Sequence, residues 1–123
     1  MSRILVVDDD PDILEVLKII LVQEGFTVRS VPRGEQAIQN IFEFNPELVI
    51  LDVMMGYTDG RAVCNTIKST ASISNIPVVM ISASHDLQEK WKINCSPDAF
   101  VAKPFDIQNL VDTVRRTLEA ARN

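Results

Sequence analysis

Ile4-Leu5-Val6-Val7-Asp8-Asp9-Asp10 is the stretch that decides the fold of this 123-residue chain, because four apolar residues run directly into three carboxylates. An uninterrupted apolar run of this length, rich in Ile and Val, is typical of a parallel strand buried on both faces. The carboxylates would then lie at the C-terminal end of the strand, where open α/β sheets bind ligands. The stretch therefore predicts a buried strand with a polar site at its end.

The three acids have two interpretations. Pro11 follows them, and apolar residues recur at helical spacing in residues 12–24, so that one acid can serve as a helix N-cap. A cap needs only one acid, and clustered carboxylates repel one another unless a cation or protons compensate their charge. We therefore expect a hard-cation site at this position beside the cap.

The rest of the chain repeats one unit, which is an apolar run followed by a turn and an amphipathic helix. Further strands are predicted at residues 26–31, 48–52, 76–82 and 99–102. Helices are predicted at residues 12–24 and 34–44, after Asp59-Gly60, at 86–95 and from Ile107 onward. This alternation predicts an α/β fold, a doubly wound, five-stranded parallel sheet of flavodoxin-like strand order 2-1-3-4-5 with five helices.

Polar residues follow four of the five predicted strands. Asp8 and Asp9 follow the first, Asp52 the third, Ser82 the fourth and Lys103 the fifth. Right-handed crossovers place the C-terminal ends of all parallel strands at one edge of the sheet, so these side chains are expected to converge. The second strand is more polar and offers no such group, and we expect it at the edge of the sheet.

Composition and charge limit the class of protein. The chain is 46% hydrophobic and 24% charged, which suits a single soluble domain covering residues 1–123. Its net charge is −5 and it contains no basic run, so direct binding of nucleic acid or of a membrane surface by this segment is not expected. Neither a signal peptide nor a membrane span is evident, and the cytoplasm is the expected compartment.

Four groups of residues also carry a family resemblance. They are Asp8-Asp9, Asp52, Ser82-Ala83 and Lys103-Pro104-Phe105, each after its predicted strand. In order and spacing they resemble the signature of the response-regulator receiver domains of two-component signalling, a chemotaxis-type receiver fold. The resemblance covers essentially the whole chain. It implies a phosphoacceptor switch that is not an enzyme in the usual sense but assists its own phosphorylation and dephosphorylation.

By this resemblance, Asp52 is the phosphoacceptor and receives a phosphoryl group from a phosphohistidine. The donor would be a sensor histidine kinase or a histidine phosphotransfer protein. Asp9 and Asp52 would hold Mg²⁺ together with the backbone carbonyl of Met54, and Asp8 would act largely through a bound water. The output partner, or a fused effector domain, is left open, as is whether the chain stands alone or begins a longer regulator.

The resemblance also implies the switch. Lys103 would pair with one phosphoryl oxygen, and Ser82 would donate its hydroxyl to another once Asp52 is modified. Phe100 matches an aromatic position that turns inward as the hydroxyl moves, although simple core packing explains an aromatic residue there equally well. The Lys103–Pro104 bond is expected to be cis.

Some positions depart from the family pattern. Gly56 stands where the family usually has proline, so the loop after Asp52 is expected to be more mobile. Ser96-Pro97 replaces the usual Gly-Ala before the fifth strand. Met54 and Ser84 cannot orient a hydrolytic water as an amide or carboxylate could, and this predicts a long-lived phosphorylated state.

Two other functions are compatible with parts of the sequence. Asp8-x-Asp10 after an apolar strand is also found in haloacid-dehalogenase-type phosphatases, which turn over small phosphoesters but usually need a longer chain. A receiver-like interaction module that never accepts phosphate is the second alternative, and the complete set of site residues argues against it.

The first helix suggests a partner surface. On a helical projection of residues 12–24, the stripe facing the core contains Ile13, Leu14, Val16, Leu17, Ile20 and Leu21. Ile19 and Val22 are left on or near the polar side. Exposed apolar pairs of this kind often mark docking surfaces, unless neighbouring loops cover them.

Overall fold

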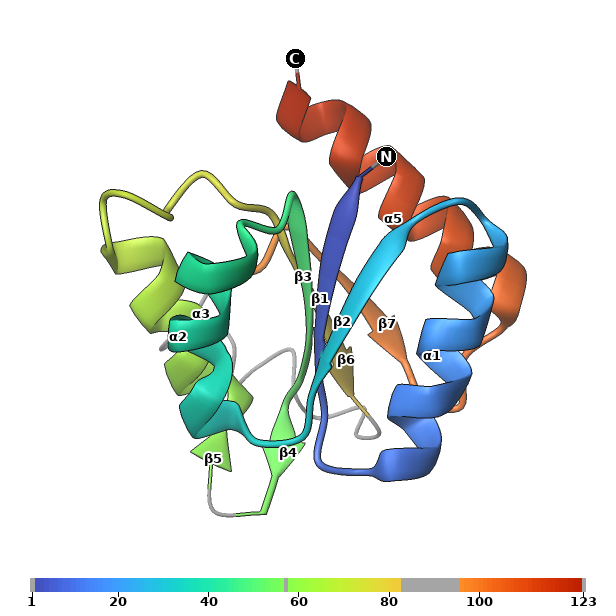
Figure 1. The fold of residues 1–123 in the computed structure, drawn as a ribbon, viewed down its shortest axis with the longest axis horizontal. Coiled ribbons are helices and arrows are strands. Elements are labelled where there is room, and N and C mark those ends of the chain that lie inside the picture. The colour runs from blue at the N-terminus through green and yellow to red at the C-terminus, as the bar shows by residue number, and fades with distance from the viewer. Residues whose placement is uncertain (1, 57, 83–95, 123) are drawn as a thin grey trace.

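The computed structural model describes residues 2–56, 58–82 and 96–122, and it contains the predicted parallel sheet. Its strands are β1 (Arg3–Val7), β2 (Thr27–Val31), β3 (Leu48–Asp52), β6 (Val78–Ser82) and β7 (Ala99–Ala102). Their order is β2-β1-β3-β6-β7, and every pairing in this sheet is parallel (Figure 1). Since β6 and β7 are the fourth and fifth predicted strands, the predicted order is confirmed, with the polar β2 at an edge.

Four α-helices connect and cover the strands within the described residues. They are α1 (Pro11–Gln23), α2 (Ala37–Phe44), α3 (Gly60–Ser69) and α5 (Ile107–Arg122), with a 3₁₀ turn, η1 (Gly34–Gln36), before α2. Helices α1 and α5 cover one face of the sheet, and α2 and α3 cover the other (Figure 1). The helix predicted at residues 86–95 lies outside the described residues.

The local sequence explains where α1 and α2 begin and end. Asp10 is the N-cap of α1, because its carboxylate accepts the Asp12 N–H at 2.9 Å, and Pro11 occupies the first helical turn. Gly25, at φ +94°, follows the C-cap of α1 and ends the helix in the left-handed region that glycine tolerates best. Asn45, at φ 51°, has the same role after α2.

The core has two layers, one on each face of the sheet, because successive side chains of β1 point to opposite faces. Leu5 and Val7 face the α2 and α3 side, whereas Ile4 and Val6 face the α1 and α5 side. Every residue of β3 and β6 is buried. Ile4, Leu5, Val6 and Val7 are completely buried too, so the prediction that this first strand is buried on both faces is correct.

A short antiparallel hairpin, which the sequence did not predict, follows β3. Its arms are β4 (Met54–Met55) and β5 (Thr58–Asp59), with Met54 opposite Asp59 and Met55 opposite Thr58. Asp59 then caps α3 by accepting the Arg61 N–H at 2.9 Å. The hairpin thus lies directly between the last residue of β3 and the helix that follows.

One residue of the predicted α1 core stripe is outside the core. Val16 is 43% exposed, whereas Leu14, Leu17, Ile20 and Leu21 are buried as predicted. On a helical projection Val16 lies next to Ile20 at the border of the stripe, and the roll of the helix on the sheet turns it outward. Val16 therefore joins Ile19 and Val22 in an exposed apolar row.

None of the helices among the described residues is both long and apolar enough to cross a membrane.

Candidate functional site

The ends of four strands bring the predicted site residues together. Asp52, the last residue of β3, pairs with Ile81, and the next residue of β6 is Ser82. Ser82 in turn pairs with Ala102, which precedes Lys103. Asp8 follows β1, whose Val7 lies opposite Leu51 of β3. The predicted convergence at the C-terminal edge of the sheet is thus what the structure contains.

Asp8, Asp9 and Asp52 form a compact acidic cluster. Each offers a carboxylate oxygen, and the three oxygens lie within 4.8 Å of one another. Asp8 and Asp52 are only 1% and 5% exposed, whereas Asp9 is exposed to solvent. Carboxylate oxygens at this spacing, open on one side, suit a hard divalent cation such as Mg²⁺, which needs few carboxylates because it keeps several waters.

Lys103 is the cation of this cluster within the described residues. Its Nζ lies 3.2 Å from Asp8 Oδ2 and 3.4 Å from Asp52 Oδ1. One ammonium therefore faces two buried carboxylates, with a third carboxylate close by. The cluster keeps a surplus of negative charge that a divalent cation would balance.

Burial and charge shift the pKa values of both partners. Burial and, to a lesser extent, the neighbouring Asp8 carboxylate raise the pKa of Asp52, and because Lys103 only partly offsets them the resulting pKa is about 6. For Lys103, burial alone would lower the pKa, but the attraction of Asp52 and Asp8 outweighs it, so the net shift is upward. The ammonium form of Lys103 is thus favoured, whereas the charged form of Asp52 is disfavoured in the absence of a cation.

The three consecutive acids have different partners. Asp8 Oδ1 accepts the Asp10 N–H at 2.9 Å, and Oδ2 accepts from Lys103, so both of its oxygens are in use. Asp10 is the helix cap described above and is not part of the acidic cluster. Asp9 extends into solvent from between them. The N-cap interpretation is therefore confirmed for Asp10, whereas Asp8 and Asp9 join Asp52 in a cluster that is compatible with the expected cation site.

Gly60 fixes the backbone at Asp52. A Cβ added to Gly60 would lie 2.0 Å from the Asp52 carbonyl oxygen, so only glycine allows this close approach. The Gly60 N–H also donates to the Val53 carbonyl at 2.7 Å. The first residue of α3 thereby holds the end of β3 in place.

The remaining predicted residues lie around the cluster. Ser82 is buried at the end of β6, and its carbonyl accepts the Lys103 N–H at 2.7 Å. The Lys103–Pro104 bond is cis, as predicted. Phe100 is 37% exposed, so the core-packing interpretation of this residue is wrong for this conformation. Met54 is 70% exposed, and Ser84 lies outside the described residues.

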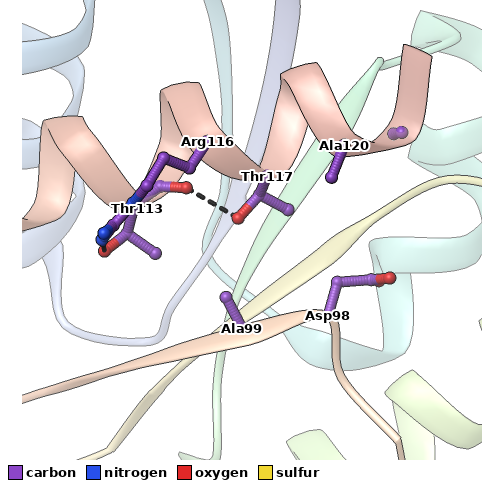
Figure 2. Close-up of a pocket in the computed structure, with 7 residues that line it drawn as sticks. Asp98, Ala99, Thr113, Arg116, Thr117 and Ala120 are labelled. Carbon is purple, nitrogen blue, oxygen red and sulfur yellow. Dashed lines mark hydrogen bonds between the residues drawn. The ribbon is translucent and has the colours of Figure 1, made fainter. Parts of the chain in front are cut away.

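A separate hollow of about 400 Å³ lies between α5 and the start of β7 (Figure 2). Its polar groups have partners, since the Thr117 hydroxyl donates to the Thr113 carbonyl at 2.6 Å and Asp98 pairs with Lys68 at 2.7 Å. It adjoins Ala99, at the opposite end of β7 from Lys103. The hollow is therefore distinct from the acidic cluster.

Sequence reasoning missed the residues that surround the loop after Asp52. Thr58 Oγ1 donates to Glu35 Oε2 at 2.8 Å, and Glu35 lines a hollow together with Asp9. The sequence pattern predicted a regular helix from residue 34, whereas Gly34 is the first residue of the 3₁₀ turn and packs closely against Thr58 and Met55. The pairing of Glu35 with Thr58 has no local signal, because 23 residues separate the two.

The fold and this cluster define a class, the α/β domain with a carboxylate site at the C-terminal edge of its sheet. The family model "Response regulator receiver domain" matches residues 4–115. The chain therefore belongs to the response-regulator receiver domain family, as the sequence resemblance predicted, and receiver domains are the phosphoacceptor switches of two-component systems.

Relatives and solved structures agree with this assignment. The chain is 38% identical over 118 residues to the DNA-binding response regulator MtrA of Mycolicibacterium smegmatis, covering 95% of this chain and 50% of MtrA. It is 32% identical to the DNA-binding dual master transcriptional regulator RpaA of Synechocystis, covering 96% of this chain and 49% of RpaA. The signal receiver domain of a signal transduction histidine kinase from Syntrophus aciditrophicus superposes with a TM-score of 0.90 at 31% identity, covering 98% of this chain and 92% of that one.

The chain spans about half the length of the curated relatives it matches. These matches concern receiver domains, and nothing in them favours a haloacid-dehalogenase-type phosphatase or a phosphate-independent module.

Proposed function

We propose that Asp52 is the phosphoacceptor of this receiver domain and that a phosphohistidine on a sensor histidine kinase or a histidine phosphotransfer protein is the donor. The observation that carries the proposal is the position of its carboxylate. Asp52 is nearly buried at the end of β3, 3.4 Å from the Lys103 ammonium and beside two further carboxylates. A nucleophile, a fixed positive charge and a set of cation ligands therefore lie together.

The chemistry requires the ionised form of Asp52. A carboxylate oxygen forms the bond to phosphorus while the phosphorus–nitrogen bond breaks, and the electron pair leaves with the imidazole nitrogen. With a pKa raised to about 6, Asp52 is largely ionised at neutral pH, yet its charge is poorly solvated. Lys103 is placed to compensate negative charge on the transferred oxygens.

Mg²⁺ fits the carboxylate set, and we assign Asp9, Asp52 and the Met54 backbone carbonyl as its ligands. Asp8 would act through a bound water, since hydrogen bonds from Asp10 and Lys103 already engage both of its oxygens. When bound, the cation neutralises charge on the phosphoryl oxygens. The exposed Asp9 is the ligand most accessible from solvent.

Ser82 and Phe100 are the proposed switch residues. The Ser82 hydroxyl would donate to a phosphoryl oxygen, and Phe100, now partly exposed on the edge strand β7, would turn inward. Such a change would alter the surface of β7 for an output partner or a fused effector domain.

For the rest, we propose that residues 1–123 form a single receiver domain that works in the cytoplasm. It would assist its own phosphorylation and dephosphorylation without being an enzyme of independent substrates. DNA binding is named for MtrA and RpaA as whole proteins, and we assign no nucleic acid or membrane contact to this segment, given its net charge of −5.

The test of the proposed function is phosphorylation by acetyl phosphate with Mg²⁺, followed by intact mass. The wild type is expected to gain one phosphoryl group, and Asp52→Asn to gain none. Asp112→Asn, which changes an exposed acid on α5, is the matched control and should be phosphorylated normally. An unmodified wild type would favour the interaction module, and continued turnover of small phosphoesters would favour a phosphatase.

We also propose that the kinase or phosphotransfer protein docks on α1. The exposed apolar row of Val16, Ile19 and Val22 runs along this helix, and Ile19 is 52% exposed. A hollow of about 510 Å³ between Ile13 and the Lys103–Phe105 segment connects the helix to the reaction site. A partner on this face could therefore reach Asp52 and the apolar row together.

The docking proposal predicts that Ile19→Ser slows phosphotransfer from the cognate kinase but leaves phosphorylation by acetyl phosphate unchanged. Phe42→Ser, an equally exposed apolar residue on α2, is the control and should change neither rate. If phosphotransfer to Ile19→Ser keeps its original rate, α1 is not the docking surface.

A further inference from the structure

The loop that carries the Met54 carbonyl is attached to a distant part of the chain. Met55 of β4 lies opposite Thr58 of β5, and Thr58 Oγ1 donates to Glu35 Oε2 of η1 at 2.8 Å. Of these elements, β4 and η1 border a hollow of about 410 Å³ whose lining includes Asp9, Glu35, Met55 and Gly56. The hydrogen bond therefore connects the hairpin to η1 next to the acidic cluster.

Close packing accompanies this hydrogen bond. A Cβ added to Gly34 would lie 2.5 Å from Thr58 Cγ2 and 2.9 Å from Met55 Cε, so Thr58 and Met55 rest directly on the glycine. Met55 is buried in the core on the α2 and α3 side. Both the methyl and the hydroxyl of Thr58 are thus held by η1, and we call this contact the Glu35–Thr58 clasp.

Two of the described residues of the hairpin, Met54 and Gly56, provide little side-chain restraint. Gly56 has φ +50°, a conformation in which glycine retains more freedom than any other residue. The Met54 side chain is largely exposed and does not anchor its own backbone. Within the described part of the hairpin, the anchors are therefore Met55 in the core, Thr58 in the clasp and Asp59, which lies opposite Met54 and caps α3.

We propose that Glu35 and Thr58 are positioning residues for the cation site, because the clasp limits the positions that the Met54 backbone can take. This inference rests on the proposed function, in which the Met54 carbonyl is a Mg²⁺ ligand. Neither side chain is a ligand itself. Their effect is to reduce the conformational freedom that the loop loses when its carbonyl binds a cation.

The negative charge of Glu35 can also affect Mg²⁺ affinity, and the experiment must distinguish this effect from that of the clasp. The hydrogen bond from Thr58 lowers the pKa of Glu35, so its carboxylate is ionised at neutral pH and attracts cations at a distance. Thr58→Val removes the donor but leaves this charge and the shape of the side chain. Thr58→Ser keeps a hydroxyl and is the conservative rescue.

The measurement is calorimetric titration of the whole chain with Mg²⁺ alone, without a phosphodonor, together with thermal melts in the absence of metal. Thr58→Val is expected to weaken Mg²⁺ binding by about 2- to 10-fold, the range for losing one hydrogen bond. Thr58→Ser should bind nearly as the wild type does. Thr66→Val, which removes an exposed hydroxyl on α3, should leave the affinity unchanged.

Glu35 gives a second test if Thr58→Val fails to fold. Glu35→Ala should weaken Mg²⁺ binding more than Glu35→Gln, since the amide keeps an acceptor oxygen for Thr58. Equal weakening by both variants would show that only the charge matters and would overturn the clasp. Weak binding by Thr58→Ser, equal to that of Thr58→Val, would overturn it as well.

The proposed function fails in a different way. If Asp9→Asn keeps wild-type Mg²⁺ affinity, the cation site itself is wrong. If Asp9→Asn loses the cation while Thr58→Val and Glu35→Ala bind it normally, the site is right and the clasp has no positioning role.

Discussion

The two ends of the sheet handle charge in opposite ways. At the C-terminal edge, one ammonium faces two of three clustered carboxylates, and burial together with Asp8 raises the pKa of Asp52, which is about 6. At the N-terminal edge, Glu47 accepts from Arg122 at 3.1 Å and from the Arg3 N–H at 3.4 Å. Burial alone would raise the pKa of Glu47, but these partners lower it overall.

This difference separates a binding site from a structural contact. The Glu47 carboxylate has its partners in the folded chain and lies at the surface, so nothing further is required to stabilise its charge. The acidic cluster contains three carboxylates and one ammonium, and a bound cation would reduce this excess of negative charge. Repulsion within such a cluster lowers the stability of the metal-free protein. Binding of a cation relieves the repulsion, and this relief adds to the binding free energy.

The largest expected effect comes from removing Asp9, a proposed Mg²⁺ ligand at the acidic edge. Asp9→Ala should abolish the Mg²⁺-dependent rise in melting temperature and block phosphorylation by acetyl phosphate, while the fold is retained because Asp9 is exposed. Relief of repulsion can also raise the metal-free melting temperature. Thermal melts with and without Mg²⁺ measure both effects, and an unchanged metal-dependent shift in the variant would remove Asp9 from the site.

The second-largest effect is expected on the lifetime of the phosphorylated state when Met54 is replaced. Met54 has no polar group with which to orient a water in line with phosphorus, so Met54→Asn should speed phosphate loss several-fold. Because Met54 is exposed, Met54→Ala should increase access of water only slightly. Decay is followed with Mg²⁺ after the donor is removed, and equal rates for the two variants would show that water positioning is not the reason.

A third prediction concerns the stability cost at Asp52. Its folded-state pKa is raised, so the folded protein binds the proton more tightly than the unfolded chain, and stability falls as pH rises from about 4 through about 6. Without metal, Asp52→Asn should therefore stabilise the protein by about 1–3 kcal/mol near neutral pH, and the gain should vanish near pH 4.

Urea melts of wild type and Asp52→Asn in a chelator, at about pH 7.5 and about pH 4, measure this difference. Addition of Mg²⁺ should reduce the advantage of the variant at neutral pH, because only the wild type keeps its full set of ligands. If Asp52→Asn is less stable than the wild type at neutral pH, the ionised Asp52 carboxylate does not destabilise the folded protein and this prediction is wrong.

The smallest effect is expected at the N-terminal edge, and it has the opposite sign. Glu47→Gln should destabilise the protein by less than about 1 kcal/mol, since the pair with Arg122 is exposed to solvent and screened. The pKa of Glu47 is lowered, so its contribution is present above the unfolded value of about 4.5 and is lost as pH falls below it. A gain in stability from Glu47→Gln near neutral pH would remove the contrast between the two edges.

The sequence predicted the sheet well because its strands are distinct in local pattern. Leu48–Asp52 and Val78–Ser82 are continuous apolar runs that end in one polar residue, and both are buried strands. Strand order also followed, since alternating strands and helices leave few arrangements with right-handed crossovers. The family signature fixed the roles expected of Asp52, Ser82 and Lys103.

Other features depended on contacts that no local pattern encodes. Val16 was placed in the core, yet it is exposed, because the sheet determines how α1 is rolled about its axis. Residues 34–36 form a 3₁₀ turn and not the start of a regular helix, since Gly34 packs against Thr58 and Met55.

By itself, the sequence determined which residues form the strands of the sheet, the edge at which its polar groups gather, and that one of the three consecutive acids caps a helix. These follow from short-range periodicity, capping and connectivity. Only the tertiary structure decided that Lys103 lies between Asp8 and Asp52, that Gly60 fits against the Asp52 carbonyl, and that Glu35 holds Thr58. The physical reason is that hydrogen bonds, ion pairs and close packing act over a few ångströms in space, whereas the residues they join can be far apart in the chain, as Lys103 and Asp8 are at 95 positions.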